Sequence, residues 1–287
     1  MKERLIVVGK NSYVGKCFTE FAVSEHREVI ALGSRDCDFL VADEVMGFFK
    51  GLDDVPHTVV FFAVINKSVE SSYRSMLANI QIVKPLIEGC QLANIASVVY
   101  ISSVDVYGVH PELPITEQSQ INPDTWYGLA KSNCEWMLST SGEVTFPVTI
   151  LRIPGIFGYA PNDKSVILRM VERILKEGRV VINGGGKARR DFVWTDDLCR
   201  LLWRLLPLKY DGVLNAATGR CHTIHEVVDL IGQVLDVSFK VEYVATDTER
   251  EFDLVYDNRA LMELLPGFEF ESLEEGIGSY QAVLQMG

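Results

Sequence analysis

The fold is decided by the stretch Arg4-Leu-Ile-Val-Val-Gly9, which Lys10-Asn-Ser-Tyr-Val-Gly15 follows directly. The first six residues are a short apolar run, rich in β-branched side chains, that ends in glycine. Such a run is typical of a buried parallel strand. A tight glycine turn follows, and the amphipathic segment from Tyr13 to Val23 then predicts a helix. The order of strand, glycine turn and helix is that of the first strand-turn-helix unit of a dinucleotide-binding fold.

Each position of this turn has a physical role. Gly9 permits the turn, Gly15 permits close packing of helix on strand, and the helix N-terminus presents N–H groups to a pyrophosphate. Ser12 stands where the motif has its middle glycine, and a serine is small enough to let a phosphate approach. The candidate cofactor-binding residues of the turn are Gly9, Asn11, Ser12, Tyr13, Val14 and Gly15.

Further apolar runs recur along the first half of the chain. They cover residues 28–33, 58–64, 97–103 and 148–153, and they alternate with helical stretches near 43–51, 70–94 and 123–140. This alternation predicts an α/β fold, a doubly wound parallel sheet with helices on both faces. Ligands bind at the carboxyl ends of the strands in such sheets, so the residues that follow each strand are the candidates for a site.

Composition narrows the class of protein. The 287 residues are 48% hydrophobic and 10% aromatic, which gives enough core for one large domain or two intimate ones. No apolar run approaches the length of a membrane span, and Met1-Lys-Glu-Arg leads into a strand rather than a signal peptide. We therefore expect a cytoplasmic protein without a membrane partner.

Charge and cysteine content argue against a nonspecific nucleic-acid-binding protein and against a cysteine-based metal site. The formal net charge of −12 opposes nonspecific binding of nucleic acid, so an anionic ligand must be held by locally placed cations. The six cysteines form no CxxC pair and no Cys/His metal spacing. We expect reduced core thiols and no metal site.

The segment Tyr127-Gly-Leu-Ala-Lys131 carries the clearest chemical signal. Its spacing places a phenol and an ammonium group on one helix face, about one turn apart. A phenol with its usual pKa is a poor proton donor or acceptor at neutral pH, and a nearby cation lowers that pKa. Lys131 is the candidate for this cation. The pair follows a serine-rich strand end, Ser102-Ser103.

Taken in order, the glycine turn, the serine-rich strand end and Tyr-x-x-x-Lys resemble the extended short-chain dehydrogenase/reductase family. Two later segments resemble its nucleotide-sugar epimerase, dehydratase and reductase group: 183–198, where these enzymes hold a sugar nucleotide, and 250–258, with a second diphosphate-binding arginine. The motifs are closest to NDP-4-keto-6-deoxy-sugar reductases such as GDP-fucose synthase and dTDP-4-dehydrorhamnose reductase. The resemblance spans about residues 4 to 264. It implies a Rossmann-type fold and a nucleotide-diphosphate sugar as substrate.

The resemblance also assigns catalytic roles. Ser103 holds the substrate oxygen, Tyr127 protonates it, and Lys131 lowers the pKa of Tyr127 and hydrogen-bonds the nicotinamide ribose. These roles suit the chemistry, because hydride addition to a ketone develops negative charge on oxygen. The alternative role for Ser103 is a hydroxyl that only hydrogen-bonds the backbone at the strand end. The implied cofactor-binding positions further along are Asp38, Ala63, Val64, Tyr127, Lys131 and Pro154.

Arg35 bears on the choice of cofactor. An arginine at the end of the second strand accommodates the 2′-phosphate of NADP, whereas an acidic residue there binds the ribose of NAD. The segment from Ser34 also resembles the loop in which an arginine of GDP-fucose synthase meets that phosphate. Asp36 is adjacent, so a surface Arg-Asp pair is the alternative. We predict a preference for NADP(H), with NAD(H) possible.

The strand end near Ser103 discriminates among the chemistries of the group. Its 4,6-dehydratases carry Thr-Asp-Glu where this chain reads Ser103-Val104-Asp105, so dehydration is disfavoured. Asp105 is a candidate substrate-binding residue or a cap. The main prediction is a reductase of a 4-keto sugar. The alternatives are an NAD-dependent 4-epimerase, which keeps its cofactor bound, and a noncatalytic dinucleotide sensor.

Substrate contacts are predicted from charge and from the resemblance. A diphosphate needs arginine forks or backbone N–H groups, and Arg190 and Arg250 lie in the two segments that supply them. Arg189 is the competing choice for the first, and Asn183 is a further candidate for the substrate pocket. Arg152 lies within a strand and is expected to pair internally.

The predicted domains are a cofactor domain over residues 1–160, to which 190–212 returns, and a smaller substrate-binding lobe over 161–189 and 213–287. The helices near 70–94 and 123–140 carry apolar residues on more than one face. In the related enzymes these helices form a four-helix interface, so a homodimer is expected.

Overall fold

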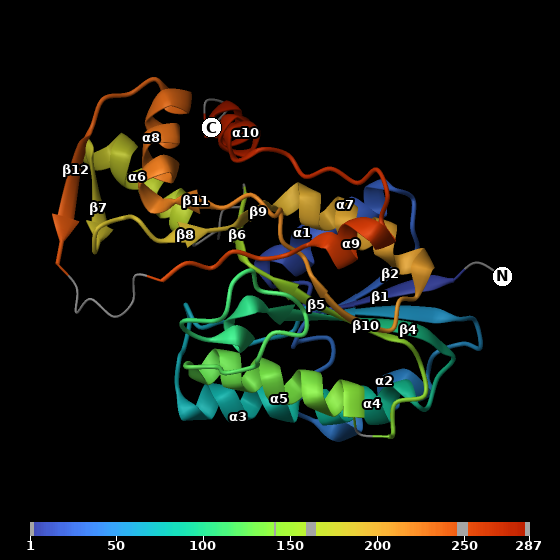
Figure 1. The fold of residues 1–287 in the computed structure, drawn as a ribbon. Coiled ribbons are helices and arrows are strands. Elements are labelled where there is room, and N and C mark those ends of the chain that lie inside the picture. Colours follow the sequence, from blue (N-terminus) through green and yellow to red (C-terminus); the bar gives the residue numbers. More distant parts are fainter. Residues whose placement is uncertain (1–2, 141, 159–164, 246–251, 285–287) are drawn as a thin grey trace. The chain divides into compact units, whose positions relative to one another are not determined.

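The computed structural model describes residues 3–140, 142–158, 165–245 and 252–284 (Figure 1). The chain forms two compact units. The first consists of Met1–Gly108, Ile121–Arg152 and Cys199–Leu214, and the second of Val109–Gln120, Ile153–Leu198 and Asn215–Gly287.

The first unit is built on a six-stranded sheet in the order β10-β5-β4-β3-β1-β2. β1 pairs in parallel with β2 and β3, and β3 pairs in parallel with β4. The strands are β1 Arg4–Val8, β2 Val29–Leu32, β3 His57–Phe61, β4 Ile95–Ser103, β5 Val148–Ile153 and β10 Gly212–Asn215. The predicted parallel, doubly wound α/β sheet is confirmed.

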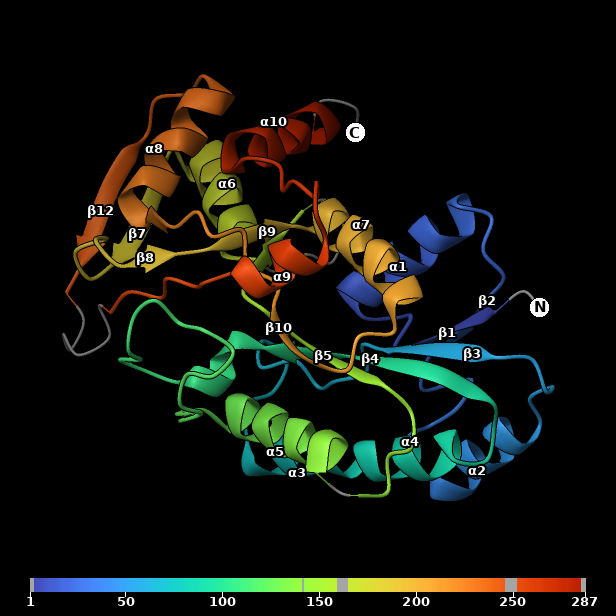
Figure 2. The same ribbon diagram turned by 45° about the vertical axis from the view of Figure 1, so that its right-hand side comes forward.

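Helices cover both faces of this sheet (Figures 1 and 2). One face carries α1 and the part of α7 from Cys199 onward, joined by an edge-on contact of the Phe21 and Trp203 rings, 6.0 Å between centroids. The other face carries α2 to α5. The bounds are α1 Tyr13–Ser24, α2 Ala42–Lys50, α3 Tyr73–Gln81, α4 Val83–Cys90, α5 Trp126–Thr140 and α7 Thr195–Leu205, with short 3₁₀ turns η1 Val104–Tyr107 and η2 Leu206–Leu208.

The strand order reverses direction between β1 and β3, because the chain runs outward from β1 to β2 and then returns to the other side of β1. Open parallel sheets bind ligands at such a switch point, outside the carboxyl ends of the two strands. Here those ends are Gly9, after β1, and Phe62-Ala63, after β3. The fold therefore places the glycine turn at the ligand-binding position of the sheet.

The single helix expected near 70–94 is instead two helices, α3 and α4, which meet at Ile82. Pro85 is the physical reason. Proline has no N–H to donate to the carbonyl four residues earlier, and its ring clashes with that carbonyl, which belongs to Gln81. Gln81 is also the last residue of α3. The prediction of one continuous helix is therefore wrong, because Pro85 imposes a break.

The strand expected over 58–64 is shorter than predicted, because β3 ends at Phe61. Its neighbour β1 ends at Val8, whose carbonyl accepts the N–H of Phe62 at 2.8 Å. Beyond that bond β1 offers no further ladder partner. The chain leaves the sheet there, and residues from Ala63 onward become a loop at the carboxyl edge.

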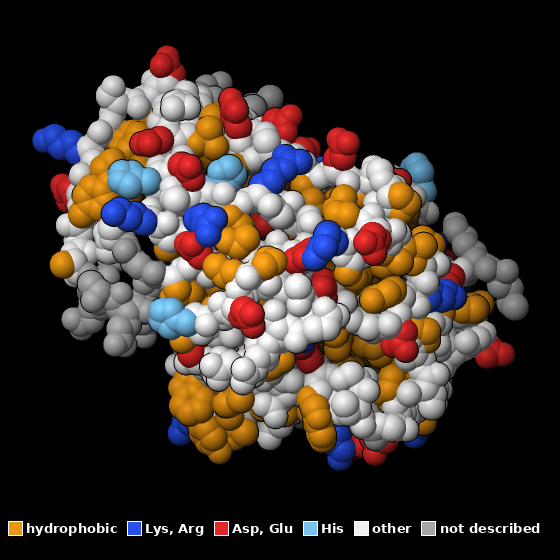
Figure 3. Space-filling view, in the orientation of Figure 1, with side chains coloured by type: hydrophobic (Ala, Val, Ile, Leu, Met, Phe, Trp, Pro, Cys, Tyr) orange, Lys and Arg blue, Asp and Glu red, His pale blue; other side chains and the backbone are white. Residues whose placement is uncertain are grey.

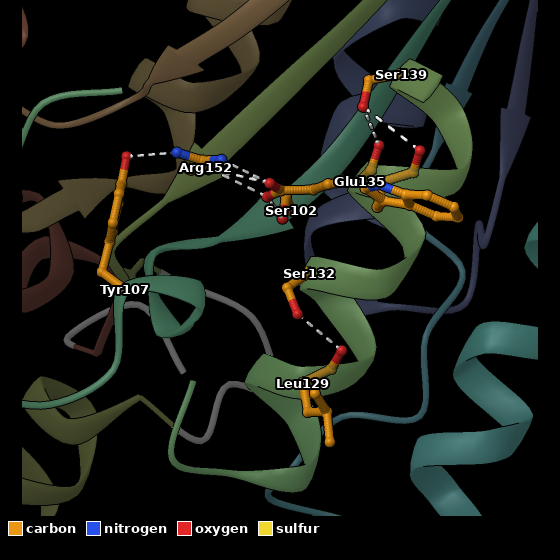
Figure 4. Close-up of polar contacts among 8 residues, drawn as sticks. Ser102, Tyr107, Leu129, Ser132, Glu135, Ser139 and Arg152 are labelled. Atoms are coloured by element: carbon orange, nitrogen blue, oxygen red, sulfur yellow. Dashed lines mark hydrogen bonds and ion pairs between the residues drawn. The ribbon is translucent and has the colours of Figure 1, made fainter. Parts of the chain in front are cut away.

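A polar network lies within the core of the first unit (Figure 4). Glu135 on α5 and Arg152 on β5 form an ion pair, Nη2 to Oε2 2.7 Å, with side chains only 7% and 5% exposed. Arg152 Nε also donates to both carboxylate oxygens of Glu135 at 3.1 and 3.2 Å. Ser102 on β4 donates to the same carboxylate, and Arg152 Nη1 donates to the Tyr107 hydroxyl at 2.8 Å. The expectation that Arg152 pairs internally is confirmed.

The second unit has its own apolar core, made by helices packed on short strands. β6 pairs in parallel with β9, β7 in parallel with β12, and β8 antiparallel with β11. Its further elements are β6 Gly155–Phe157, α6 Val166–Glu177, β7 Arg179–Asn183, β8 Arg189–Arg190, β9 Phe192–Trp194, β11 His222–Thr223, α8 Ile224–Leu235, β12 Lys240–Val244, α9 Arg259–Leu264 and α10 Leu273–Leu284.

The two units and the domains predicted from sequence divide the chain at different residues. The first unit takes in 199–214, against the predicted return of 190–212, and the second unit takes in 109–120. A substrate-binding role for the second unit stays a prediction. None of the helices in the described ranges is both long enough and apolar enough to span a membrane.

The buried ion pair gives a stability prediction. Glu135→Ala leaves the Arg152 guanidinium buried without its carboxylate, and breaking a buried pair in this way costs about 3–5 kcal/mol. We expect that loss in the free energy of unfolding from urea titrations. The exposed pair of Lys84 with Glu88 provides the control, and Lys84→Met changes stability little. Equal effects of the two substitutions would contradict a special role for the buried pair.

Candidate active site

The helix α5 brings the predicted Tyr and Lys to the carboxyl edge of β4. Thr125 caps its first turn, since the Thr125 hydroxyl accepts the N–H of Gly128 at 3.0 Å. Gly128 then allows close packing, because a Cβ there would lie 2.5 Å from the carbonyl oxygen of Asp105. The first turn of α5 therefore lies directly against η1, the turn that follows Ser103.

Lys131 is buried, with 3% of its surface exposed. Its ammonium group donates to the carbonyl oxygen of Ile101 at 2.6 Å and to the Tyr100 hydroxyl at 3.3 Å, both on β4. Burial lowers the pKa of Lys131 to about 8, while the neighbouring Glu135 acts in the opposite direction. The lysine is thus fixed at the strand end and is still mostly charged at neutral pH.

Ser103 is the last residue of β4 and is 8% exposed. Its hydroxyl oxygen accepts the N–H of Asp105 at 3.2 Å and so caps η1. This is the backbone-satisfying role considered as an alternative from the sequence. A hydroxyl that accepts in this way still has a proton to donate, so capping and holding a substrate oxygen are compatible.

Tyr127 is half-buried and lies near two lysines. The centroid of its ring is 5.9 Å from Lys131 Nζ and 5.6 Å from Lys67 Nζ. Burial raises the pKa of the phenol above its usual value, and the negative charge of Asp105 adds to the effect. The lowering of this pKa by Lys131 stays a prediction. Desolvation is the larger influence, and the ammonium group of Lys131 bonds to β4.

Lys67 was not among the candidates from sequence. It lies in the loop after β3 and forms an ion pair with Asp105, which was predicted as a substrate-binding residue. Its position provided a signal, since residues just beyond a strand at the carboxyl edge are where sites form. Glu135 was also overlooked, although it lies four residues after Lys131 and eight after Tyr127, on the same helix face.

The glycine turn has the geometry that a dinucleotide requires. Gly9 adopts φ +96°, and a Cβ there would lie 2.6 Å from the backbone nitrogen of Ala63. Ser12 caps α1, with its hydroxyl accepting the N–H of Gly15 at 3.1 Å and donating to the Gly9 carbonyl at 2.8 Å. The first-turn amides of Tyr13 and Val14 lie at the N-terminus of a 12-residue helix, which favours an anion.

Two charges of opposite sign follow β2. Asp36 accepts the N–H of Gly33 at 2.7 Å and pairs with Lys10 of the glycine turn at 2.7 Å, and these bonds lower its pKa. Arg35 is exposed, and within the described residues it forms no ion pair. Asp36 is thus engaged by Lys10, which excludes the surface Arg35-Asp36 pair considered from sequence.

The remaining cofactor candidates lie at strand ends or in the second unit. Asp38 accepts the N–H of Leu40 at 2.9 Å and so closes its own turn. Ala63 and Val64 are half-buried and follow β3 at the switch point. Pro154 is buried and directly follows β5, at the start of a segment of the second unit.

In the second unit, Arg189 and Arg190 have different partners. Arg189 pairs with Asp253 at 2.8 Å. Arg190 Nη1 donates to the carbonyl oxygens of Arg189 and Phe252 at 2.8 and 2.6 Å, and its guanidinium lies 5.3 Å from the Phe252 ring. Within the described residues Arg190 forms no ion pair, and its interaction with the nearby Asp253 carboxylate is electrostatic only. This difference favours Arg190 over Arg189 as an anion-binding residue.

Asn183 is exposed at the end of β7, which pairs with β12. Arg250, the second predicted diphosphate-binding residue, lies outside the described residues. His110 and Arg190 both contact Phe252, with the His110 ring centroid 5.0 Å from that of Phe252. No sequence pattern indicates this His110-Phe252-Arg190 stack, since its members are far apart in the chain.

The chain is similar to known proteins over most of its length. Residues 5–217 match the model of the NAD dependent epimerase/dehydratase family. A putative UDP-glucose 4-epimerase of Methanocaldococcus jannaschii is 25% identical over 261 residues, which cover 84% of each chain.

Two solved structures have the same fold. The UDP-N-acetylglucosamine 4-epimerase from Methanobrevibacter ruminantium M1, in complex with UDP-N-acetylmuramic acid, has a TM-score of 0.86 and 23% identity, with both chains covered completely. The structure of RMD from Pseudomonas aeruginosa complexed with NADPH has a TM-score of 0.82 and 21% identity, and 98% of each chain is covered.

The glycine turn at the switch point and the α5 pair beside β4 lie within the matched residues. The resemblance inferred from the sequence motifs is thus confirmed, and the protein belongs to the NAD dependent epimerase/dehydratase family.

Proposed function

We propose that this protein is an NAD(P)-dependent 4-epimerase of a nucleotide-diphosphate sugar. The observation that carries the proposal is the position of Tyr127 and Lys131 on α5, which Gly128 allows to pack directly onto the turn capped by Ser103. The relative with 25% identity is named as a putative UDP-glucose 4-epimerase, which supports epimerisation over the reduction that the sequence analysis favoured.

The protein groups have separate roles in this reaction. Tyr127 takes the proton of the sugar hydroxyl as the carbon is oxidised and returns it when the ketone is reduced. Ser103 donates a hydrogen bond to the same oxygen and stabilises its developing charge. Lys131 supplies a fixed positive charge at the strand end. The nicotinamide, when bound, accepts a hydride and gives it back.

The glycine turn fits such a cofactor, because the backbone at Gly9 leaves no space for a side chain and α1 begins shortly after it, at Tyr13. Arg190 is proposed to bind the substrate diphosphate, since arginine forks match phosphate oxygens. Arg250 and Asn183 keep their predicted substrate contacts as proposals. The predicted cytoplasmic location is likewise retained as a proposal.

Reduction of a 4-keto sugar is the second candidate, and Arg35 is the observation that favours it. Its exposed guanidinium follows β2, where a 2′-phosphate of NADP(H) would be bound. A reductase consumes one reduced cofactor per turnover, whereas an epimerase returns the hydride to its own substrate. Counting cofactor consumed against sugar converted therefore distinguishes the two functions.

Substitution of Tyr127 tests the proposal. We expect the purified protein to interconvert 4-epimers in a panel of UDP-, GDP- and dTDP-linked sugars without net consumption of cofactor, as followed by proton NMR. Tyr127→Phe removes the proton-transferring hydroxyl, which should lower kcat by roughly 100- to 10,000-fold.

Tyr210→Phe is the matched control, since Tyr210 lies beside the first residues of β5, where its carbonyl accepts the Thr149 hydroxyl at 2.6 Å, and its kcat should equal that of the unmodified protein. Stoichiometric oxidation of NADPH by a 4-keto sugar would instead establish the reductase. Full activity in Tyr127→Phe would remove Tyr127 from the mechanism altogether.

Arg35→Ala tests cofactor selection. A charge-assisted hydrogen bond is worth about 1.5–3 kcal/mol, so loss of Arg35 should weaken NADP⁺ binding by roughly ten-fold or more. NAD⁺ has no 2′-phosphate and should bind as before, as measured by isothermal titration calorimetry. Arg173→Ala, on the exposed face of α6, is the control. An equal loss of affinity for both cofactors would mean that Arg35 does not bind the 2′-phosphate.

We also propose a homodimer through α3 and α5. Tyr73, Trp126, Leu129 and Trp136 are 57%, 45%, 36% and 66% exposed, and the last three lie along one stripe of α5. The Tyr73 and Trp126 rings contact each other edge-on. Hydrophobic side chains gather over this part of the surface in Figure 3. A patch of this kind is typical of an interface.

Trp136→Glu tests the dimer by placing a charge at the most exposed residue of that stripe. We expect a dimer for the unmodified protein and a monomer for the variant in analytical ultracentrifugation. Leu175→Glu is the control, because Leu175 is similarly exposed (48%) but lies on α6. A monomeric unmodified protein, or a variant that remains dimeric, would contradict this interface.

A further inference from the structure

We propose that Lys67 is a positioning residue of the active site, whose ammonium group neutralises Asp105 beside Tyr127 and so keeps the phenol able to release its proton. The proposal rests on the proposed function, because it concerns the group that moves the proton. It adds a charge pair, Lys67 with Asp105, to the Ser103, Tyr127 and Lys131 that the family resemblance supplied.

The geometry places one cation against both an acid and the phenol. Lys67 Nζ donates a hydrogen bond to Asp105 Oδ2, and the same Nζ lies 5.6 Å from the centroid of the Tyr127 ring. Asp105 is the closer partner and is 22% exposed, whereas Lys67 is 51% exposed. At such a distance one unit charge changes a neighbouring pKa by about one unit when the site is partly open to water.

The loop that carries Lys67 is anchored. Asn79 on α3 accepts the N–H of Ile65 at 2.7 Å and donates to its carbonyl at 3.0 Å, and Asn79 is 5% exposed. One residue further, Asn66 accepts the N–H of Ser68 at 2.9 Å, which closes a turn around Lys67. These bonds fix the backbone at the residue that faces Asp105.

Asp105 without its lysine would act against catalysis. Burial raises the pKa of Tyr127, and the carboxylate of Asp105 raises it further by opposing the phenolate. A base must lose its proton before it can accept one, so this second effect would lower the active fraction. Lys67 offsets the charge of Asp105 through a direct hydrogen bond to its carboxylate.

The groups around Tyr127 leave three charges to consider. Tyr100 on β4 and Cys134 on α5 are buried, and burial raises the pKa of both, so both stay neutral. Ser103 carries no charge. Lys131 faces the ring from α5 at 5.9 Å, but its ammonium donates to the carbonyl oxygen of Ile101. Lys67, Asp105 and Lys131 therefore set the electrostatic balance among the described residues.

A charge-rescue series tests the proposal through the pH dependence of kcat/KM. Lys67→Met should raise the midpoint of the limb that vanishes in Tyr127→Phe by about one pH unit, and Asp105→Asn should lower it. The double variant carries neither charge, so its midpoint should return close to that of the unmodified protein. A merely structural role for Lys67 would lower activity without moving the midpoint.

Lys176→Met is the matched control, because Lys176 pairs with Glu172 at 3.3 Å on the surface of α6, and its profile should not change. Two results would overturn the proposal. One is an unshifted midpoint in Lys67→Met, and the other is a double variant displaced as far as Lys67→Met alone.

A second readout does not require turnover and separates this proposal from the proposed function. The ¹³Cζ signal of Tyr127 in tyrosine-labelled protein is assigned by its loss in Tyr127→Phe. Its ionisation midpoint should be lower in Asp105→Asn than in Lys67→Met, even if no nucleotide sugar is converted. Equal midpoints, or a phenol that stays neutral up to pH ~11 in Asp105→Asn, would overturn the role of the charge pair.

Discussion

A carboxylate buried in a protein core must be paired, and the pairing of Glu135 with Arg152 constrains the whole active-site edge of the first unit. Glu135 comes from α5 and Arg152 from β5, while Ser102 of β4 and Tyr107 of η1 complete the hydrogen bonds. The ion pair and its hydrogen bonds thus join α5 to both β4 and β5. Because isolated buried charges are costly, these elements have little freedom to slide past one another. The phenol and ammonium on α5 are held in register with the end of β4 as a result.

On the same helix, burial and nearby charges have opposing effects on the ionisable groups. Burial opposes the charge of Lys131 and the ionisation of Tyr127, as the directions of their pKa shifts indicate. Glu135 offsets part of the effect for Lys131, and Lys67 offsets the charge of Asp105 near Tyr127. The site therefore combines buried groups, such as Lys131, with charges arranged in opposed pairs, and electrostatic interactions are stronger where water is excluded.

Much of the first unit could be predicted from local signals in the sequence. Short apolar runs that end in glycine or serine predicted β1 and β4, and the four-residue spacing predicted that Tyr127 and Lys131 share a face. The break at Ile82 could also have been predicted, because Pro85 excludes a continuous helix. The contacts of Lys67 with Asp105, and of His110 and Arg190 with Phe252, could not. They join residues distant in the chain, and no periodicity encodes such pairings.

The sequence-based preference for reduction depends on Arg35. The charge of Arg35 indicates that it can bind the 2′-phosphate of NADP(H). It does not indicate whether the cofactor is exchanged at each turnover, which is what distinguishes a reductase from an epimerase. Epimerisation and reduction use the same phenol, ammonium and hydroxyl, so the site residues alone do not separate them. Family membership and the similarity to a putative 4-epimerase favour epimerisation over reduction.

The most direct measurement follows a deuterium placed at C4 of a nucleotide-diphosphate sugar during turnover in ordinary water. If one retained nicotinamide removes and returns the hydride, the epimerised product keeps the deuterium at C4. Replacement of that deuterium by solvent hydrogen, or its release on free cofactor without epimerisation, would contradict the account.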